Sequence, residues 1–340
     1  MKTTLTSTLA ISLALAAGAA WADGNLNIYA WSDSIDPALI EQFASEHGVT
    51  VDVASYQSNE DLLTKLQAGS SGYDIVMPSQ HFVKIMVDLG LLQVIDIKST
   101  PAYERIAEQW RGQWWDPDNA YSIPFALGTA GFAVNRDLYS GPIDSWSVYF
   151  EPGPDLAGKI GSLDYPDEVV GAAQLYLGVP FCSENPEEMK RVLDLLKAQK
   201  ASVASYSSDN IEDRIGSGQV AAHFWWDGEA SQSRIKGANV EYAMPKEGLV
   251  GWLDSLVVPV GAPNLDNAMA FIDFMSQPDH ATQQANYYGH GSPITINEAD
   301  AVNSPEVAPE IYPTVPVVFS QACSPAAQDL VTRVWTELLQ

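Results

Sequence analysis

Hydrophobic residues between positions 26 and 90 form short continuous runs that alternate with segments of helical spacing. Three apolar runs predict strands, and the intervening segments place apolar residues three and four positions apart, as an amphipathic helix does. The predicted strands are 26–31, 49–53 and 74–77. Because strands and helices alternate, the sequence predicts an α/β fold with a mostly parallel sheet.

The predicted helices have recognisable first and last residues. Asp36 and Pro37 begin the first helix as N-cap and first helical residue, and Gly48 ends it. Ser58 begins the second helix, with Asp61 three residues later in the manner of a capping box. Further helices are predicted at 81–89 and 186–199, and a further strand at 220–226.

The composition is that of a folded, strongly acidic protein. The 340 residues are 46% hydrophobic, and 43 acidic against 17 basic residues give a net charge of −26. Nucleic acids and anionic membranes require clustered positive charge, so neither is an expected partner. The length predicts two domains or one large domain.

The first 22 residues have the pattern of a secretory signal peptide. Met1-Lys2 gives a positive start, 9–20 is an apolar run, and Ala20-Trp21-Ala22 fits the cleavage rule for small residues. The apolar run is too short to span a bilayer. We therefore expect a mature chain that starts at Asp23 and is exported to a bacterial periplasm.

Common catalytic and metal-binding motifs are absent from the sequence. It has no Walker loop, no His-Glu-x-x-His, no Gly-x-Ser-x-Gly and no Cys-x-x-Cys, and its five histidines lack metal-ligand spacing. Gly216-x-Gly218-x-x-Ala221 leads into a strand rather than out of one, so it predicts a turn. Asp116-Pro117-Asp118-Asn119 lacks the other ligands of a calcium loop and also predicts a turn. We expect no cofactor and no metal.

Tryptophan stands beside acid in three segments, two of them at predicted strand ends. They are Trp31-Ser32-Asp33, Trp226-Asp227-Gly228-Glu229 and Trp252-Leu253-Asp254. An alkylammonium binds well between an aromatic face, which attracts the cation, and a carboxylate, which accepts charge-assisted hydrogen bonds. Any single pair is better explained as a core Trp beside a solvated acid. The repetition, however, indicates a site for a small cationic ligand.

Longer segments of the chain resemble the periplasmic spermidine/putrescine-binding proteins, the receptors of polyamine ABC importers. The similar segments are 26–33, 73–79, 121–125 and 245–255, and they include Trp-Ser-Asp at 31–33 and Trp-x-Asp-Ser at 252–255. The resemblance covers nearly the whole chain after the signal. It implies the type II periplasmic binding protein fold, in which two crossover strands join two α/β lobes as a hinge. It places lobe 1 at 23–127 and 256–312, and lobe 2 at 128–255 and 313–340.

The same resemblance implies which residues bind the ligand. Trp226 and Trp252 match the family's aromatic walls, and Asp254 matches its principal amine-binding carboxylate. A second ammonium is expected at one of three further acids: Asp33, Glu168 or Glu229. The full expected set is Trp31, Ser32, Asp33, Ser79, Glu168, Trp226, Glu229, Trp252, Asp254 and His290.

Two positions depart from the family's pattern. Ser34 stands where the family usually has an aromatic residue, and His290 stands where it has a site tyrosine. Both differences bear on which amine is bound. A site histidine also predicts pH-dependent binding, because protonation below about pH 6.5 would repel a cationic ligand.

Cys182 and Cys323 are the only cysteines in the sequence. An isolated pair in an oxidising compartment often forms a disulfide. If the C-terminal tail returns to lobe 2, as the resemblance implies, both lie in that lobe and can meet. Two separate buried thiols are the alternative.

The sequence therefore predicts a binding protein, not an enzyme, that captures a polyamine such as putrescine or spermidine and delivers it to a membrane permease. We expect it to act as a monomer. One alternative is a receptor for another small cationic solute or for a sugar, because stacked Trp rings also suit sugars. Another is a secreted hydrolase that uses paired carboxylates such as Glu168 and Asp254.

Overall fold

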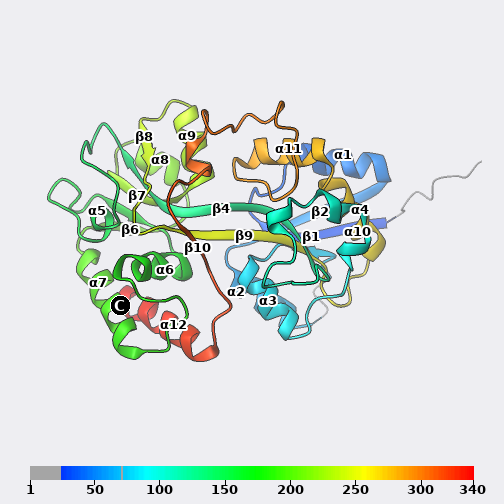
Figure 1. The fold of residues 1–340 in the computed structure, drawn as a ribbon, viewed down its shortest axis with the longest axis horizontal. Coiled ribbons are helices and arrows are strands. Elements are labelled where there is room, and N and C mark those ends of the chain that lie inside the picture. Colours follow the sequence, from blue (N-terminus) through cyan, green and yellow to red (C-terminus); the bar gives the residue numbers. More distant parts are fainter. Residues whose placement is uncertain (1–23, 70–71) are drawn as a thin grey trace, which may run out of the picture.

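The structure, a computed structural model, describes residues 24–69 and 72–340, so the predicted signal peptide lies outside the described residues. Strands and helices alternate along most of the chain (Figure 1). The strands are β1 (Gly24–Trp31), β2 (Val49–Tyr56), β3 (Ile75–Val76), β4 (Ser122–Asn135), β5 (Ile160–Ser162), β6 (Val203–Tyr206), β7 (Ala222–Trp226), β8 (Val240–Tyr242), β9 (Leu249–Val257) and β10 (Val317–Phe319). The α-helices are α1 (Pro37–His47), α2 (Asn59–Gln67), α3 (Gln80–Asp88), α4 (Pro101–Arg105), α5 (Ser147–Phe150), α6 (Pro166–Leu177), α7 (Pro186–Lys200), α8 (Ile211–Gly216), α9 (Asp227–Ile235), α10 (Leu265–Met275), α11 (Pro278–Tyr288) and α12 (Pro325–Leu339).

The residues predicted to begin and end the first helices make capping contacts in the structure. The Asp36 side chain accepts a hydrogen bond from the Ala38 amide at the start of α1, and Gly48 ends that helix with a φ of 67°. The Ser58 hydroxyl accepts one from the Asp61 amide at the start of α2. Each contact satisfies an amide that has no partner within its helix.

Both parallel and antiparallel pairs occur in the sheet, which has the order β2-β1-β3-β9-β4-β7-β5-β6. β1 pairs in parallel with β2 and β3, as do β5 with β6 and β7, whereas β4 pairs antiparallel with β7, β8 and β9. The predicted mostly parallel sheet is therefore right only for the outer strands. The pairs made by β4 are antiparallel, and its pair with β9 is so because β4 carries the chain from one lobe to the other and β9 carries it back (Figure 1).

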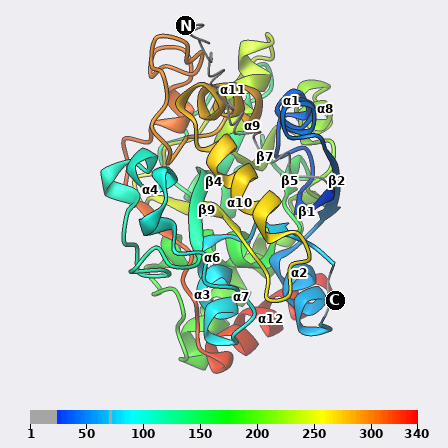
Figure 2. The same ribbon diagram turned by 90° about the vertical axis from the view of Figure 1, so that its right-hand side faces the viewer.

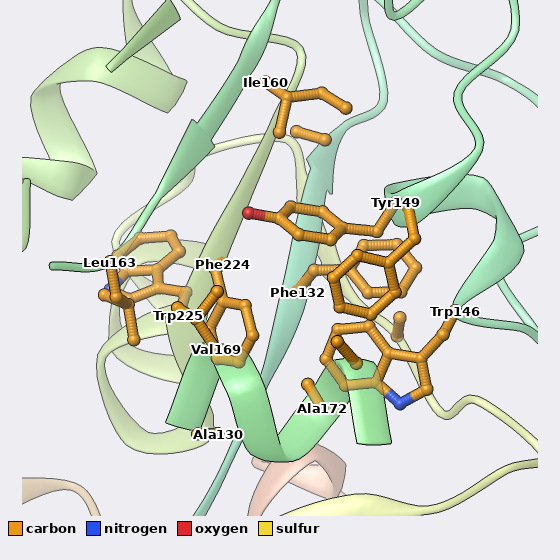
Figure 3. Close-up of a cluster of buried hydrophobic side chains, with 14 of the residues drawn as sticks. Ala130, Phe132, Trp146, Tyr149, Ile160, Leu163, Val169, Ala172, Phe224 and Trp225 are labelled. Atoms are coloured by element: carbon orange, nitrogen blue, oxygen red, sulfur yellow. The ribbon is translucent and has the colours of Figure 1, made fainter. Parts of the chain in front are cut away.

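Two lobes with separate hydrophobic cores flank β4 and β9, as expected for the type II fold. In one lobe, the rings of Phe132, Trp146, Tyr149 and Phe224 pack together with centroids 5.3–6.0 Å apart (Figure 3). The two polar groups among them are also satisfied: the Trp146 indole N–H donates to the Gly248 carbonyl at 2.8 Å, and the Tyr149 hydroxyl donates to the Gly161 carbonyl at 3.0 Å. The core of the other lobe lies between the sheet and helices such as α1 and α10, both visible in Figure 2. Its largest fully buried side chains are Phe43, Phe271, Leu26, Ile28, Leu39 and Ile75, and Leu62 belongs to a second cluster of the same lobe.

The C-terminal segment crosses back between the lobes. β10 pairs in parallel with β9, and α12 then packs against α6 and α7 (Figure 1). A disulfide joins Cys323, just before α12, to Cys182, just before α7. The tail therefore belongs to the same lobe as α6 and α7, and the disulfide fixes it there.

The two loop motifs of the sequence lie in turns of the structure. Gly216 ends α8, and Gly218, with a φ of 76°, leads into β7. The carboxylate of Asp116 accepts hydrogen bonds from the amides of Ala120, Tyr121 and Ser122. Its oxygens thus stabilise the backbone of a turn, and among the described residues no acidic, histidine or cysteine cluster is arranged to hold a metal ion.

Candidate ligand-binding site

The predicted site residues come from both lobes and from the strands between them. Trp31 ends β1 and Ser79 precedes α3 in one lobe. In the other lobe, Glu168 lies in the first turn of α6 and Trp226 ends β7. Asp254 lies in β9, which connects the two lobes. The chain therefore brings these residues together where the lobes face each other.

Asp254 is the most deeply buried acid of the predicted set, with only 4% of its surface exposed. One carboxylate oxygen accepts a hydrogen bond of 2.7 Å from the Ser79 hydroxyl, and Asn59 in turn holds Ser79. Burial raises the pKa of Asp254 to about 7, although the Ser79 hydrogen bond and the positive charge of His290 act in the opposite direction. A buried carboxyl bonded to a neutral hydroxyl gains strongly from a cation.

Glu168 is the corresponding acid on the other lobe. Both of its carboxylate oxygens lie 3.1 Å from the indole nitrogen of Trp226, which is again a neutral donor. Burial raises the pKa of Glu168 to about 8, and the nearby charges of Asp167 and Asp254 add to this effect, while the Trp226 hydrogen bond opposes it. Asp254 is thus a buried carboxyl and Glu168 a partly buried one, and an ammonium group would stabilise both in the charged form.

A row of aromatic rings runs between these two acids and across both lobes. The Trp31 ring lies 4.5 Å from that of Tyr56 and 6.2 Å from that of Tyr165. Tyr165 in turn contacts Trp226 edge to face, with the centroids 5.5 Å apart. Rings arranged in this way offer π faces to a cation and apolar surface to its methylene chain.

The sequence analysis did not include the two tyrosines of this row. Tyr56 is paired with Trp31 in the register of β1 and β2, so strand pairing would have indicated it. Tyr165 directly precedes Pro166 at the start of α6, three residues before Glu168. Tyr165 could have been included because it lies at the start of the helix that carries Glu168, a predicted site residue.

His290 forms the centre of a buried ionic cluster. Its Nδ1 lies 2.9 Å from the carboxylate of Asp227, and its Nε2 lies 3.3 Å from that of Glu229. Burial disfavours the imidazolium, but Glu229 and Asp227 outweigh this effect and raise the pKa of His290 to about 10. The expected titration near pH 6.5 is therefore wrong, because His290 carries its charge throughout the neutral range. The ring of Trp252 lies edge to face against it at 4.7 Å.

A second histidine connects the two lobes. His81, on α3, lies 3.4 Å from the carboxylate of Asp167, on α6. Their interaction lowers the pKa of Asp167 against the opposing effect of burial, and Gln328 of α12 bonds the same carboxylate. The sequence analysis missed this pair, since 86 positions separate the two residues along the chain.

Ser32 and Asp33, by contrast, lie in the exposed turn after β1, where Asp33 has a φ of 54°. Ser34, at the position where an aromatic residue was expected, is buried and donates a hydrogen bond of 2.7 Å to the Trp31 carbonyl. The structure therefore brings together eight of the ten predicted residues, and leaves Ser32 and Asp33 in contact with water.

Comparison with known proteins agrees with this geometry. Residues 38–311 match the family described as bacterial extracellular solute-binding proteins. A spermidine/putrescine-binding periplasmic protein of Escherichia coli (strain K12) is 33% identical over 89% of this chain and 87% of its own length. The chain belongs to this family. The resemblance to periplasmic polyamine-binding proteins predicted from the sequence is confirmed.

Other members of the family cover the chain almost completely. A putrescine-binding periplasmic protein of Pseudomonas aeruginosa (strain UCBPP-PA14) is 30% identical over 99% of this chain and 97% of its own length. The solved structure of a putative spermidine/putrescine ABC transporter protein from Listeria monocytogenes superposes with a TM-score of 0.85. It is 28% identical and covers 93% of this chain and 99% of its own. The solute-binding family thus shares its fold with the chain over both lobes.

No helix within 24–69 or 72–340 combines the length and the apolar character that a membrane span requires.

Proposed function

We propose that this chain is a periplasmic receptor that binds a polyamine between its two lobes and delivers it to the permease of an ABC importer. The observation that carries the proposal is a pair of carboxyls, the buried Asp254 and the partly buried Glu168, each bonded only to a neutral donor group in the contacts described above. A row of aromatic rings separates them. Two ammonium groups joined by methylenes match this order of acid, ring and acid.

The names of the relatives support the same ligand class. The matched proteins of Escherichia coli and Pseudomonas aeruginosa are named for spermidine and putrescine. Export through the signal peptide at 1–22, a monomeric state and the lobe limits at 127/128, 255/256 and 312/313 are part of the same proposal. So is a role in the site for the eight predicted residues that the structure brings together, with Asp254 and Glu168 as the acids that receive the ammonium groups.

Two alternatives fit the site less well. Sugars need many neutral hydrogen-bond partners, whereas Asp254 and Glu168 are acids that a cationic ligand would stabilise in the charged form and a neutral ligand would not. A hydrolase requires an acid with a raised pKa, and Glu168 has one. However, a carboxyl without a charged partner is equally what an ammonium receptor needs, and the family to which the chain belongs is one of solute-binding proteins.

A thermal-shift panel of diamines, triamines, amino acids and sugars tests the proposal. A ligand that binds only the folded protein, added at 100 times its dissociation constant, stabilises it by about 2.7 kcal/mol. We expect this stabilisation from putrescine or spermidine and not from sugars. Stabilisation by a sugar alone, or by no amine, would refute the polyamine assignment.

A further inference from the structure

Six acidic side chains lie on the segments that form the site, and they differ in the partners they already have. Asp167 pairs with His81 across the lobes. Asp33 is exposed, and an exposed carboxylate gains little from an ion pair. The remaining four are Glu168, Asp227, Glu229 and Asp254. The number of these four acids that lack a cationic partner within the protein decides how many cationic groups of a ligand the site can bind.

His290 already occupies two of the four acids. Only 2% of its surface is exposed, and each of its ring nitrogens faces a different carboxylate, that of Asp227 or of Glu229. The Thr129 amide and hydroxyl and the Gly228 amide also donate to Asp227, so that carboxylate is saturated. Glu229, with 40% of its side chain exposed, has its inner oxygen directed at His290.

Glycines and aromatic rings around His290 fix the position of its imidazole ring. A Cβ on Gly228 would collide with the imidazole ring, and a Cβ on Gly128 would come within 2.7 Å of Asp227 and 3.0 Å of His290. The rings of Trp252 and Tyr288 hold the imidazole at centroid distances of 4.7 and 4.6 Å. His290 is therefore a fixed internal cation within the site.

We propose that His290 is a specificity-determining residue: by occupying Glu229 it leaves only Asp254 and Glu168 for the ligand and selects diamines over triamines. The inference rests on the proposed function, since it concerns the same site. These two carboxyls then receive two ammonium groups. A third ammonium would enter a region where the nearest acid is already paired and a positive charge is already present, which disfavours it.

Calorimetric titration of the signal-free protein with putrescine and with spermidine, at one pH and salt concentration, tests this role. The wild type is expected to bind putrescine more tightly. In His290→Gln the loss of the cation frees Glu229, so the ratio of the two dissociation constants should move toward spermidine by about ten-fold or more. The control His47→Gln removes a histidine that stacks on Phe43, remote from the site, and should leave the ratio unchanged.

A double variant identifies Glu229 as the group released. Adding Glu229→Gln to His290→Gln should remove the gain for spermidine, because the freed carboxylate is gone. If His290→Gln does not fold, Glu229→Gln in the wild type is informative alone. It should weaken both amines by a similar factor, since His290 then lacks one of its two counter-charges.

The possible outcomes distinguish failure of the specificity role of His290 from failure of the proposed receptor function. An unchanged ratio in His290→Gln, with putrescine still bound, would overturn the role of His290 and leave the receptor function intact. So would a selective loss of spermidine in the single Glu229→Gln variant, because Glu229 would then hold the third ammonium directly. A wild-type protein that binds neither amine would overturn the proposed function, and the specificity role with it.

Discussion

Asp254 and Asp227 are both buried aspartates of one site, 4% and 1% exposed, yet their surroundings are opposite. Asp227 accepts hydrogen bonds from two amides and a hydroxyl and faces the imidazolium of His290. Asp254 has a hydrogen bond from the neutral hydroxyl of Ser79. The difference shows that burial alone does not define a ligand-binding acid. An acid whose charge is already compensated stabilises the fold, whereas an uncompensated one is suited to binding a cation.

The largest effect expected from this comparison is on folding stability. Asp227→Asn removes a counter-charge from a buried imidazolium, so the free energy of unfolding should fall by about 3–5 kcal/mol. Chemical denaturation of the ligand-free protein measures this change. The matched control is Asp52→Asn, since Asp52 is an exposed acid on β2 and its replacement should have little effect. A wild-type-like stability of Asp227→Asn would show that the His290 cluster is not an ion pair of consequence.

The same cluster predicts how stability depends on pH. The pKa of His290 is raised from 6.5 to about 10, so its contribution to stability is fully present below 6.5 and is lost as the pH rises through 10. The stability advantage of wild type over His290→Gln should therefore shrink across that interval. Denaturation midpoints of both proteins at several pH values provide the measurement.

The next largest effect is expected on ligand affinity and not on the free energy of unfolding. Asp254→Asn leaves an ammonium without its counter-charge, so putrescine affinity should fall by about 2–5 kcal/mol in calorimetry. The ligand-free variant should be as stable as wild type or more stable at about pH 8, because an ionised buried carboxylate destabilises the empty protein. If Asp254→Asn and Asp227→Asn behaved alike in both assays, the distinction between the two acids would be lost.

A smaller effect is expected on the pH dependence of affinity, because ligand binding should release protons from Asp254 and Glu168. Raised pKa values of about 7 for Asp254 and about 8 for Glu168 mean that both acids are partly occupied by protons in the empty site near neutral pH. An arriving ammonium displaces them, so affinity should rise with pH by up to about ten-fold per unit for each group until both are ionised. Calorimetry in buffers of different ionisation enthalpy counts the protons. No release at neutral pH would mean that both acids are already charged.

The smallest expected effect concerns the aromatic row. Trp226→Ala removes a ring face, and a desolvated cation–π contact is worth about 1–2 kcal/mol. Trp226→Phe keeps a ring but loses the indole donor to Glu168, so it should retain more affinity than Trp226→Ala. Trp114→Ala, which truncates a 42% exposed tryptophan elsewhere, serves as the control. Equal losses in both Trp226 variants would attribute the role to the indole N–H group.

Local patterns in the sequence were sufficient for the first strands and helices of the chain, for two later elements and for part of the site, but they left most other elements unpredicted. Capping residues such as Asp36 and Ser58 act within one helix, so their signals are visible in a few consecutive residues. Strand β2 nevertheless extends to Tyr56, three residues beyond its predicted end, because pairing with β1 continues there. Pairing depends on a neighbouring strand, which the apolar pattern of one segment does not describe.

The missed contacts join residues distant in the chain. His81 and Asp167 meet only because the lobes face each other. The charge of His290 depends on Asp227 and Glu229, more than sixty positions earlier. A histidine met in a sequence has its ordinary pKa by default, and only the arrangement of both carboxylates around it reverses that expectation.

The strands that cross between the lobes lie side by side, with β10 and β4 both paired to β9. Such a hydrogen-bonded ribbon bends readily out of its own plane, because that motion keeps each hydrogen bond at its length. Bending within the plane would stretch the bonds along one edge. The ribbon thus bends easily out of its plane and resists bending within it. The lobes should therefore rotate relative to each other about a single axis that lies in the plane of the ribbon. The disulfide just after β10 keeps the third strand attached throughout that rotation.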